Sequence, residues 1–143
     1  MPTFVVQLPN LVQLGPVVDV MIVPGRAAAE AMQRSGEMLP KPVQVVALID
    51  TGATGTVLQT GVAASLNLKP VGRVQITTAS SAGLECPEFS VQLLFPAARV
   101  AVEVAAIEAP MQGQPVQMLI GRDVLAGAVL VYNGVASHYS LSF

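Results

Sequence analysis

Charged side chains are scarce in this sequence: they make up 11% of its 143 residues and leave a formal net charge of −2 at pH 7. The seven basic residues are scattered along the chain, so the sequence predicts no basic patch for nucleic acid or for an anionic membrane surface. With 52% hydrophobic residues, a chain this poor in charge is expected to have apolar surface that another subunit covers. Oligomerisation and peptide or small-molecule partners are therefore favoured.

Cysteine and histidine occur once each, as Cys86 and His138. A lone cysteine excludes a disulfide within the chain and is typical of a reducing compartment. One Cys and one His give no ligand spacing for a metal, and no Gly-x-Ser-x-Gly segment is present for a serine nucleophile. We therefore expect no metal, no cofactor and no serine or cysteine peptidase chemistry.

Long hydrophobic runs are missing as well. Residues 1–18, 51–68 and 124–143 carry no charge, but Pro, Gly or polar side chains interrupt each stretch. None of them offers the roughly 20 continuous apolar residues of a membrane-spanning helix. Residues 1–18 also lack the basic start of a signal peptide. We expect a cytoplasmic protein that does not contact a membrane.

Short runs of Val, Ile, Leu and Thr between frequent Gly and Pro are typical of an all-β barrel or sandwich. Strands are predicted at 4–8, 17–23, 43–49, 74–78, 88–95, 100–107, 118–120, 128–132 and 138–142. Short helices are predicted within 59–66 and 122–127. Residues 26–38 are expected to be either a short helix or a mobile surface insertion. The length fits one domain, 1–143, with an insertion at about 24–42.

An apolar run from Val45 to Ile49 leads directly into Asp50, Thr51 and Gly52. A buried strand that ends at an acid places a carboxylate at the edge of the core, and Gly52 lets another backbone approach closely. An ordinary Asp-x-Gly turn, in which local amides bind the carboxylate, accounts for the same three residues. The pattern Asp-Thr-Gly by itself therefore leaves a catalytic and a purely structural role open.

The longer segment 45–58 resembles the active-site signature of retropepsin-like aspartic peptidases, because Asp-Thr-Gly-Ala is followed by a small hydroxyl residue and then by Thr-Val-Leu. Residues 118–125, Met-Leu-Ile-Gly-Arg-Asp-Val-Leu, are similar to the second element of that family, a strand behind the catalytic turn that continues into a short helix. Residues 129–143 resemble the closing hairpin of bacterial members. The resemblance covers about 43–143 and implies an all-β, retropepsin-like closed barrel with a single lobe and one to three short helices.

The resemblance also implies roles for individual residues. The catalytic group consists of Asp50, Thr51 and Gly52. Substrate binding is implied for two residues of the turn and for the tip of a mobile flap over the cleft: Ala53, Thr54, Ala79, Ser80 and Ser81. Structural support is implied for Gly121 and Arg122.

Position 54 departs from the viral pattern. Viral members usually have Asp where Thr54 stands, and that acid pairs with the arginine that matches Arg122. Thr54 carries no charge, so we expect Arg122 to bind another acceptor, either a backbone carbonyl or Asp123. Its guanidinium is expected to be buried beneath the catalytic turn.

The chain has one Asp-Thr-Gly turn, whereas aspartic peptidases hold a water between two carboxylates. The other aspartates, Asp19 and Asp123, are not followed by Thr-Gly or Ser-Gly, and the sequence has no internal repeat. The resemblance therefore implies a homodimeric endopeptidase whose terminal strands interleave and whose peptide or protein substrate binds as an extended strand. The alternative is a catalytically silent retropepsin-fold module for dimerisation or peptide binding.

Overall fold

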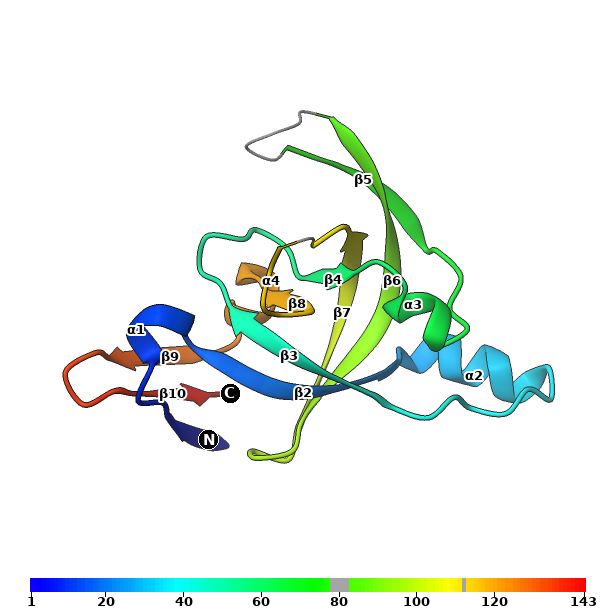
Figure 1. Ribbon diagram of the computed structural model, residues 1–143. Coiled ribbons are helices and arrows are strands. Elements are labelled where there is room, and N and C mark those ends of the chain that lie inside the picture. Colours follow the sequence, from blue (N-terminus) through cyan, green and yellow to red (C-terminus); the bar gives the residue numbers. More distant parts are fainter. Residues whose placement is uncertain (78–82, 112) are drawn as a thin grey trace.

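The computed structural model describes residues 1–77, 83–111 and 113–143. In that part of the chain the protein is mostly β, with short helices (Figure 1). The strands are β1 (Thr3–Gln7), β2 (Val17–Pro24), β3 (Val43–Ile49), β4 (Val57–Gln59), β5 (Gly72–Ile76), β6 (Leu84–Phe95), β7 (Val100–Ala109), β8 (Met118–Ile120), β9 (Val129–Asn133) and β10 (His138–Ser142). The helices are α1 (Leu11–Leu14), α2 (Arg26–Arg34), α3 (Val62–Ser65) and α4 (Arg122–Leu125). None of the helices within these described ranges is both long and apolar enough to span a membrane.

Seven strands form one sheet, in the order β2-β3-β8-β4-β7-β6-β5. The sheet closes because β2 also pairs with β6, where Met21 lies opposite Leu94. β5 stays outside this closed ring and pairs with β6 at the end of the sheet. The predicted closed barrel is therefore confirmed, with six strands in the ring and β5 as an arm beside it.

Alternating side chains of the barrel strands form the core. In β3, Val45, Ala47 and Ile49 are buried, and in β6 the same period of two buries Val91 and Leu93 completely. Ile49 is the last buried residue of β3 and the last before the Asp-Thr-Gly turn. The chain thus leaves the core at the acid that the sequence singles out.

The two ends of the chain meet in a second sheet, of order β1-β10-β9. Phe4 of β1 packs edge to face against Tyr139 of β10, and the Tyr139 hydroxyl donates to the Val17 carbonyl at 2.6 Å, which fastens this terminal sheet to β2. Burial, with a smaller contribution from the charge of Asp19, raises the pKa of Tyr139. β10 lies between two strands of its own chain, whereas the family resemblance implied terminal strands that interleave between subunits.

Three elements differ from the sequence prediction: α1, β4 and α3. α1 adds a fourth helix to the one to three expected; its four residues are too few to show a helical period, and Leu11 anchors it by being fully buried. The short strand β4 was not predicted, and only Val62–Ser65 of the expected helix at 59–66 is helical. β4 pairs with β7 and β8, whose residues lie far away in the sequence. No local sequence pattern therefore predicts this strand.

Residues 26–38 were expected to be either a short helix or a mobile insertion, and they contain the helix α2. The Arg26 amide at its start donates to the Glu103 side chain on β7, and the Gly25 amide donates to the Ser90 carbonyl on β6 at 3.0 Å. These bonds attach the beginning of α2 to the barrel wall. Figure 1 shows the rest of the helix extending away from the terminal sheet.

Candidate active site

Asp50 occupies the first position after β3, in a turn held by its own backbone. Its amide donates to the Ile120 carbonyl at 2.9 Å, and its carbonyl accepts from the Ala53 amide at 3.2 Å. One carboxylate oxygen, Oδ1, accepts from the Gly52 amide at 2.8 Å. The carboxylate is therefore oriented by the turn and sits at the edge of the barrel, and this local amide bond is also the feature expected of an ordinary Asp-x-Gly turn.

The turn is braced from behind by residues 121–124, which follow β8. The Arg122 amide donates to the Ala53 carbonyl at 2.8 Å, and the Asp123 amide donates to the Thr54 carbonyl at 3.2 Å. Gly121 makes this approach possible, because a Cβ at that position would lie 2.5 Å from the carbonyl carbon and oxygen of Gly55. The two motifs of the sequence, at 45–58 and 118–125, thus lie against each other with their backbones in contact.

The Arg122 side chain reaches along the turn. Its Nη1 donates to the Thr51 carbonyl at 2.7 Å and its Nη2 donates to Thr54 Oγ1 at 3.1 Å. The expected backbone acceptor is therefore present, but the expectation of a buried guanidinium is wrong, because Arg122 is exposed. Since Thr54 cannot neutralise the charge, an exposed position lets the guanidinium keep water on its remaining donors.

Asp123 has a contact that the sequence interpretation missed. Thr56, which is fully buried, donates from its hydroxyl to Asp123 Oδ1 at 2.8 Å and from its amide to Oδ2 at 3.0 Å. Oδ1 also accepts from the Val124 amide at 2.8 Å, and Thr56 Oγ1 accepts from the Gly121 amide at 3.2 Å. In the sequence, Thr56 lies within the first motif and Asp123 lies within the second, so the two motifs together could have indicated this contact. Asp123 therefore positions the start of β4 and, through it, the turn that carries Asp50.

The outer side of the turn is uncovered. Thr51, Gly52 and Thr54 are exposed, and Ala53 is half-buried. Next to the turn lies a hollow of about 390 Å³, lined by Thr51, Arg122, Leu125, Ala126, Ala128 and Leu130. The turn at residues 50–54 of a single chain thus presents an acid, a threonine and a glycine to the outside, beside an apolar surface.

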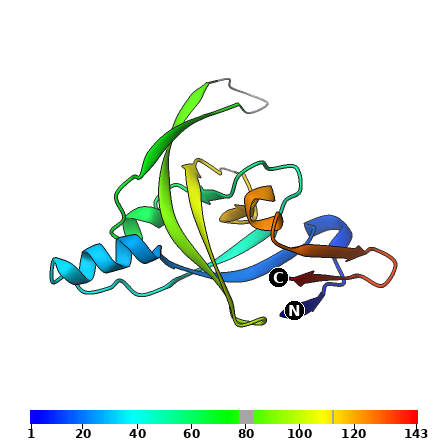
Figure 2. The same cartoon turned by 180° about the vertical axis from the view of Figure 1, so that it is seen from behind.

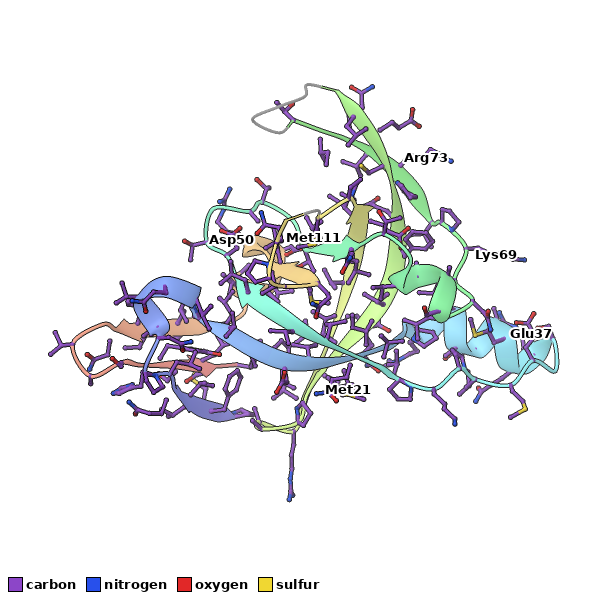
Figure 3. The ribbon with its side chains drawn as sticks, in the orientation of Figure 1. Met21, Glu37, Asp50, Lys69, Arg73 and Met111 are labelled. Atoms are coloured by element: carbon purple, nitrogen blue, oxygen red, sulfur yellow. The ribbon has the colours of Figure 1, made fainter. Side chains whose placement is uncertain are left out.

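The expected flap tip, Ala79, Ser80 and Ser81, lies outside the described residues, as does Thr78 of the predicted strand 74–78. The hairpin arms that lead to it are described: β5 pairs with the first part of β6 from Gly72 opposite Glu88 to Ile76 opposite Leu84. These arms extend beyond the barrel on the side where the Asp50 loop lies (Figure 3).

Within residues 1–77, 83–111 and 113–143, no group of three or more His, Cys, Asp or Glu side chains is arranged to hold a metal ion. Cys86 is buried, and burial raises the pKa of its thiol. A buried thiol of raised pKa is a poor nucleophile.

Comparison with known proteins gives a family for this chain and solved structures that are similar to it. The family model described as "Aspartyl protease" matches residues 36–124. Among solved structures, a retropepsin-like aspartic protease from Rickettsia conorii aligns with a TM-score of 0.50 at 12% identity, over 88% of this chain and 91% of that one. The EIAV protease in complex with the inhibitor HBY-793 aligns with a TM-score of 0.43 at 21% identity, over 82% of this chain and 92% of that one. No curated protein sequence matches this chain.

Proposed function

Because this chain belongs to the aspartyl protease family, we propose that two copies of it form an aspartic endopeptidase in which paired Asp50 carboxylates activate a water for peptide-bond hydrolysis. The observation that carries the proposal is the placement of Asp50. It follows the buried end of β3, its turn is braced by residues 121–124, and the outer side of that turn is exposed. A rigid acid with an open face is what a second, symmetry-related acid needs in order to approach.

The chemistry divides the work between two identical carboxylates. The ionised Asp50 takes a proton from the water, whose oxygen attacks the scissile carbonyl carbon, while the protonated Asp50 of the second copy donates a hydrogen bond to the carbonyl oxygen. The C–N bond of the tetrahedral intermediate then breaks as the carbonyl re-forms, and the leaving nitrogen takes the proton that the first Asp50 received from the water. Two close acids cannot both ionise cheaply, so activity should follow a bell-shaped pH profile whose two limbs belong to the pair rather than to either residue.

The substrate fits this proposal best as an extended peptide or protein segment. Gly52 is exposed and has no side chain, so its carbonyl is accessible to a peptide backbone. Ala53 and Thr54 lie on the same turn, and the β5–β6 arms extend on the side of Asp50. An added strand satisfies peptide groups without depending on side-chain identity, so an extended segment of any sequence can bind along the exposed turn. The roles proposed for Ala79, Ser80 and Ser81 at the flap tip follow from the family resemblance alone.

The test is cleavage of a peptide library by the wild type and by Asp50→Asn at matched concentrations and over a range of pH. An amide cannot act as the base, so we expect a loss of roughly a thousandfold or more. Asp19→Asn is the matched control, because it makes the same chemical change at an exposed position on β2 and should leave cleavage unchanged. Sedimentation should show dimers for all three proteins.

Two outcomes would contradict the proposal in different ways. If Asp50→Asn cuts as fast as the wild type, Asp50 is not the base. If all three proteins are dimers and none cuts any peptide at any pH, the chain is the silent dimerisation or peptide-binding module. Against that module stands the intact Asp50-Thr51-Gly52 turn, for which a non-catalytic protein has no chemical need.

A further inference from the structure

The guanidinium of Arg122 is a charge without a counter-charge. It donates to the Thr51 carbonyl and to Thr54 Oγ1, which are both neutral acceptors. In the described part of the chain no carboxylate lies within ion-pair distance of it, and the ion pair found there joins Arg73 to Glu85. A guanidinium has five N–H donors, so three remain for another acceptor. Because Arg122 is exposed, that acceptor can come from outside the chain.

The acid next to Arg122 in the sequence is already bound by other groups. Asp123 accepts through Oδ1 from the Thr56 hydroxyl and from the Val124 amide, and through Oδ2 from the Thr56 amide. These bonds satisfy the carboxylate without the guanidinium. Thr54, which the guanidinium does reach, carries no charge. The positive charge of Arg122 is therefore not neutralised by either neighbour.

The hollow beside Arg122 contains no competing charge. Its volume is about 390 Å³, and its other lining residues are Thr51, Leu125, Ala126, Ala128 and Leu130. Residues 1–18 and 124–143 contain no Asp or Glu, so a second copy that covers this hollow with either end of its chain does not bring the missing acid. This arrangement leaves the counter-charge to a ligand.

Arg122 lies at the turn that carries Asp50. Figure 2 shows α4, in orange, beside the loop that follows β3. The guanidinium reaches along this loop, since it binds both the Thr51 carbonyl and Thr54 Oγ1. Gly52 and Thr54 are exposed on the same turn, where the proposed substrate lies. A side chain of an extended peptide that passes Thr54 therefore comes close to the remaining donors of Arg122.

We propose that Arg122 determines substrate specificity by binding an acidic side chain of the peptide that is cleaved. This inference rests on the proposed function, because it assigns a side-chain preference to the same site. A guanidinium binds a carboxylate through two parallel hydrogen bonds, and the apolar walls of the hollow strengthen such a pair by limiting its exposure to water. The negative charge of the Asp50 pair repels another acid. The preference therefore falls on a position removed from the scissile bond.

The test compares peptides that carry glutamate or glutamine at each position in turn, with both ends blocked so that no terminal carboxylate takes part. Above about pH 5, where glutamate is ionised, we expect the wild type to show a kcat/KM about three- to tenfold higher for glutamate at a position removed from the scissile bond. Arg122→Gln should bring this ratio to about one. Arg34→Gln is the matched control, because it removes the same charge from an exposed position on α2 and should leave the ratio unchanged.

Thr54→Asp keeps the test decisive if Arg122→Gln does not fold. An acid at position 54 is within reach of Nη2 and neutralises the guanidinium from inside the chain, so the ratio should again fall to about one. A merely structural Arg122 predicts no change of the ratio in either variant. The inference is overturned if the wild type shows no preference for glutamate at any position, if either folded variant keeps the wild-type ratio, or if Arg34→Gln removes the preference as well.

Binding measurements separate this inference from the proposed function. Asp50→Asn, which should not cut, is titrated with the same peptides, and the preferred glutamate peptide should bind about three- to tenfold more tightly than its glutamine counterpart. A wild type that cuts peptides without this preference sinks the role of Arg122 but not the peptidase. A protein that cuts nothing but binds the glutamate peptide more tightly does the reverse, and one that neither cuts nor binds overturns both.

Discussion

The turn that carries Asp50 and the arm formed by β5 and the first part of β6 differ in how many contacts hold them in place. Residues 50–56 are bound to residues 120–124 through their backbones and through the Asp123 carboxylate. β5 buries none of its five residues and pairs only with β6 among the described strands. Arg73 and Glu85 form an ion pair of 3.7 Å across the arm, and both side chains are exposed. The contrast shows that contacts from other elements hold the turn that carries Asp50, whereas the described arms of the hairpin are held mainly by pairing with each other.

Gly121→Ala should have the largest effect on stability. Its Cβ would lie 2.5 Å from the Gly55 carbonyl group, which neither backbone can relieve without separating the two segments. We expect a loss of about 3 kcal/mol or more in the free energy of unfolding, measured by urea denaturation. Gly127→Ala is the control, since a Cβ there meets only the Val124 carbonyl oxygen at 3.9 Å. Equal stability of the two variants would refute the close packing.

Arg122→Ala should have an intermediate effect. The change removes hydrogen bonds to the Thr51 carbonyl and to Thr54 Oγ1, but it buries no unpaired charge because Arg122 is exposed. We expect a loss of about 1–2 kcal/mol by the same denaturation measurement. We also expect slower peptide cleavage, by more than the lost stability alone explains, because the Thr51 carbonyl belongs to the turn that carries Asp50. An unchanged melting curve together with unchanged cleavage would show that the guanidinium braces nothing.

Arg73→Ala should have the smallest effect. The ion pair with Glu85 is exposed at both ends, and such pairs contribute little. We expect a change within about 0.5 kcal/mol, with any effect appearing in the Michaelis constant for peptides rather than in the stability. A loss as large as that of Arg122→Ala would mean that the arm is as strongly constrained as the turn, and the contrast between the two regions would fail.

The sequence predicts the barrel and the turn because both depend on local patterns. Alternation reveals β3, and the apolar run into Asp50 reveals where the core ends. The bond between Thr56 and Asp123 was missed because the partners lie 67 residues apart and each has an ordinary local role. The exposure of Arg122 depends likewise on tertiary placement, which a local motif does not contain.

The terminal sheet shows the same limit at a larger scale. Both strands of the closing hairpin were predicted, but the position of β10 between β1 and β9 is a matter of pairing rather than of propensity. α1 escaped prediction because four residues are fewer than two helical turns. What the sequence leaves open is thus the long-range pairing, and that pairing decides which surface a second copy meets.

The measurement that decides whether catalysis needs an Asp50 from each of two chains is subunit mixing. Equal amounts of wild type and Asp50→Asn are equilibrated at fixed total concentration, and peptide cleavage is compared with that of the wild type alone. Random exchange leaves about a quarter of the dimers with both acids, so we expect about a quarter of the activity. Mixing with Asp19→Asn instead should leave the activity unchanged. With subunit exchange complete, activity of about one half, in proportion to the wild-type chains, or of about three quarters, from dimers that work with one acid, would show that one Asp50 is sufficient and would contradict the paired-acid mechanism.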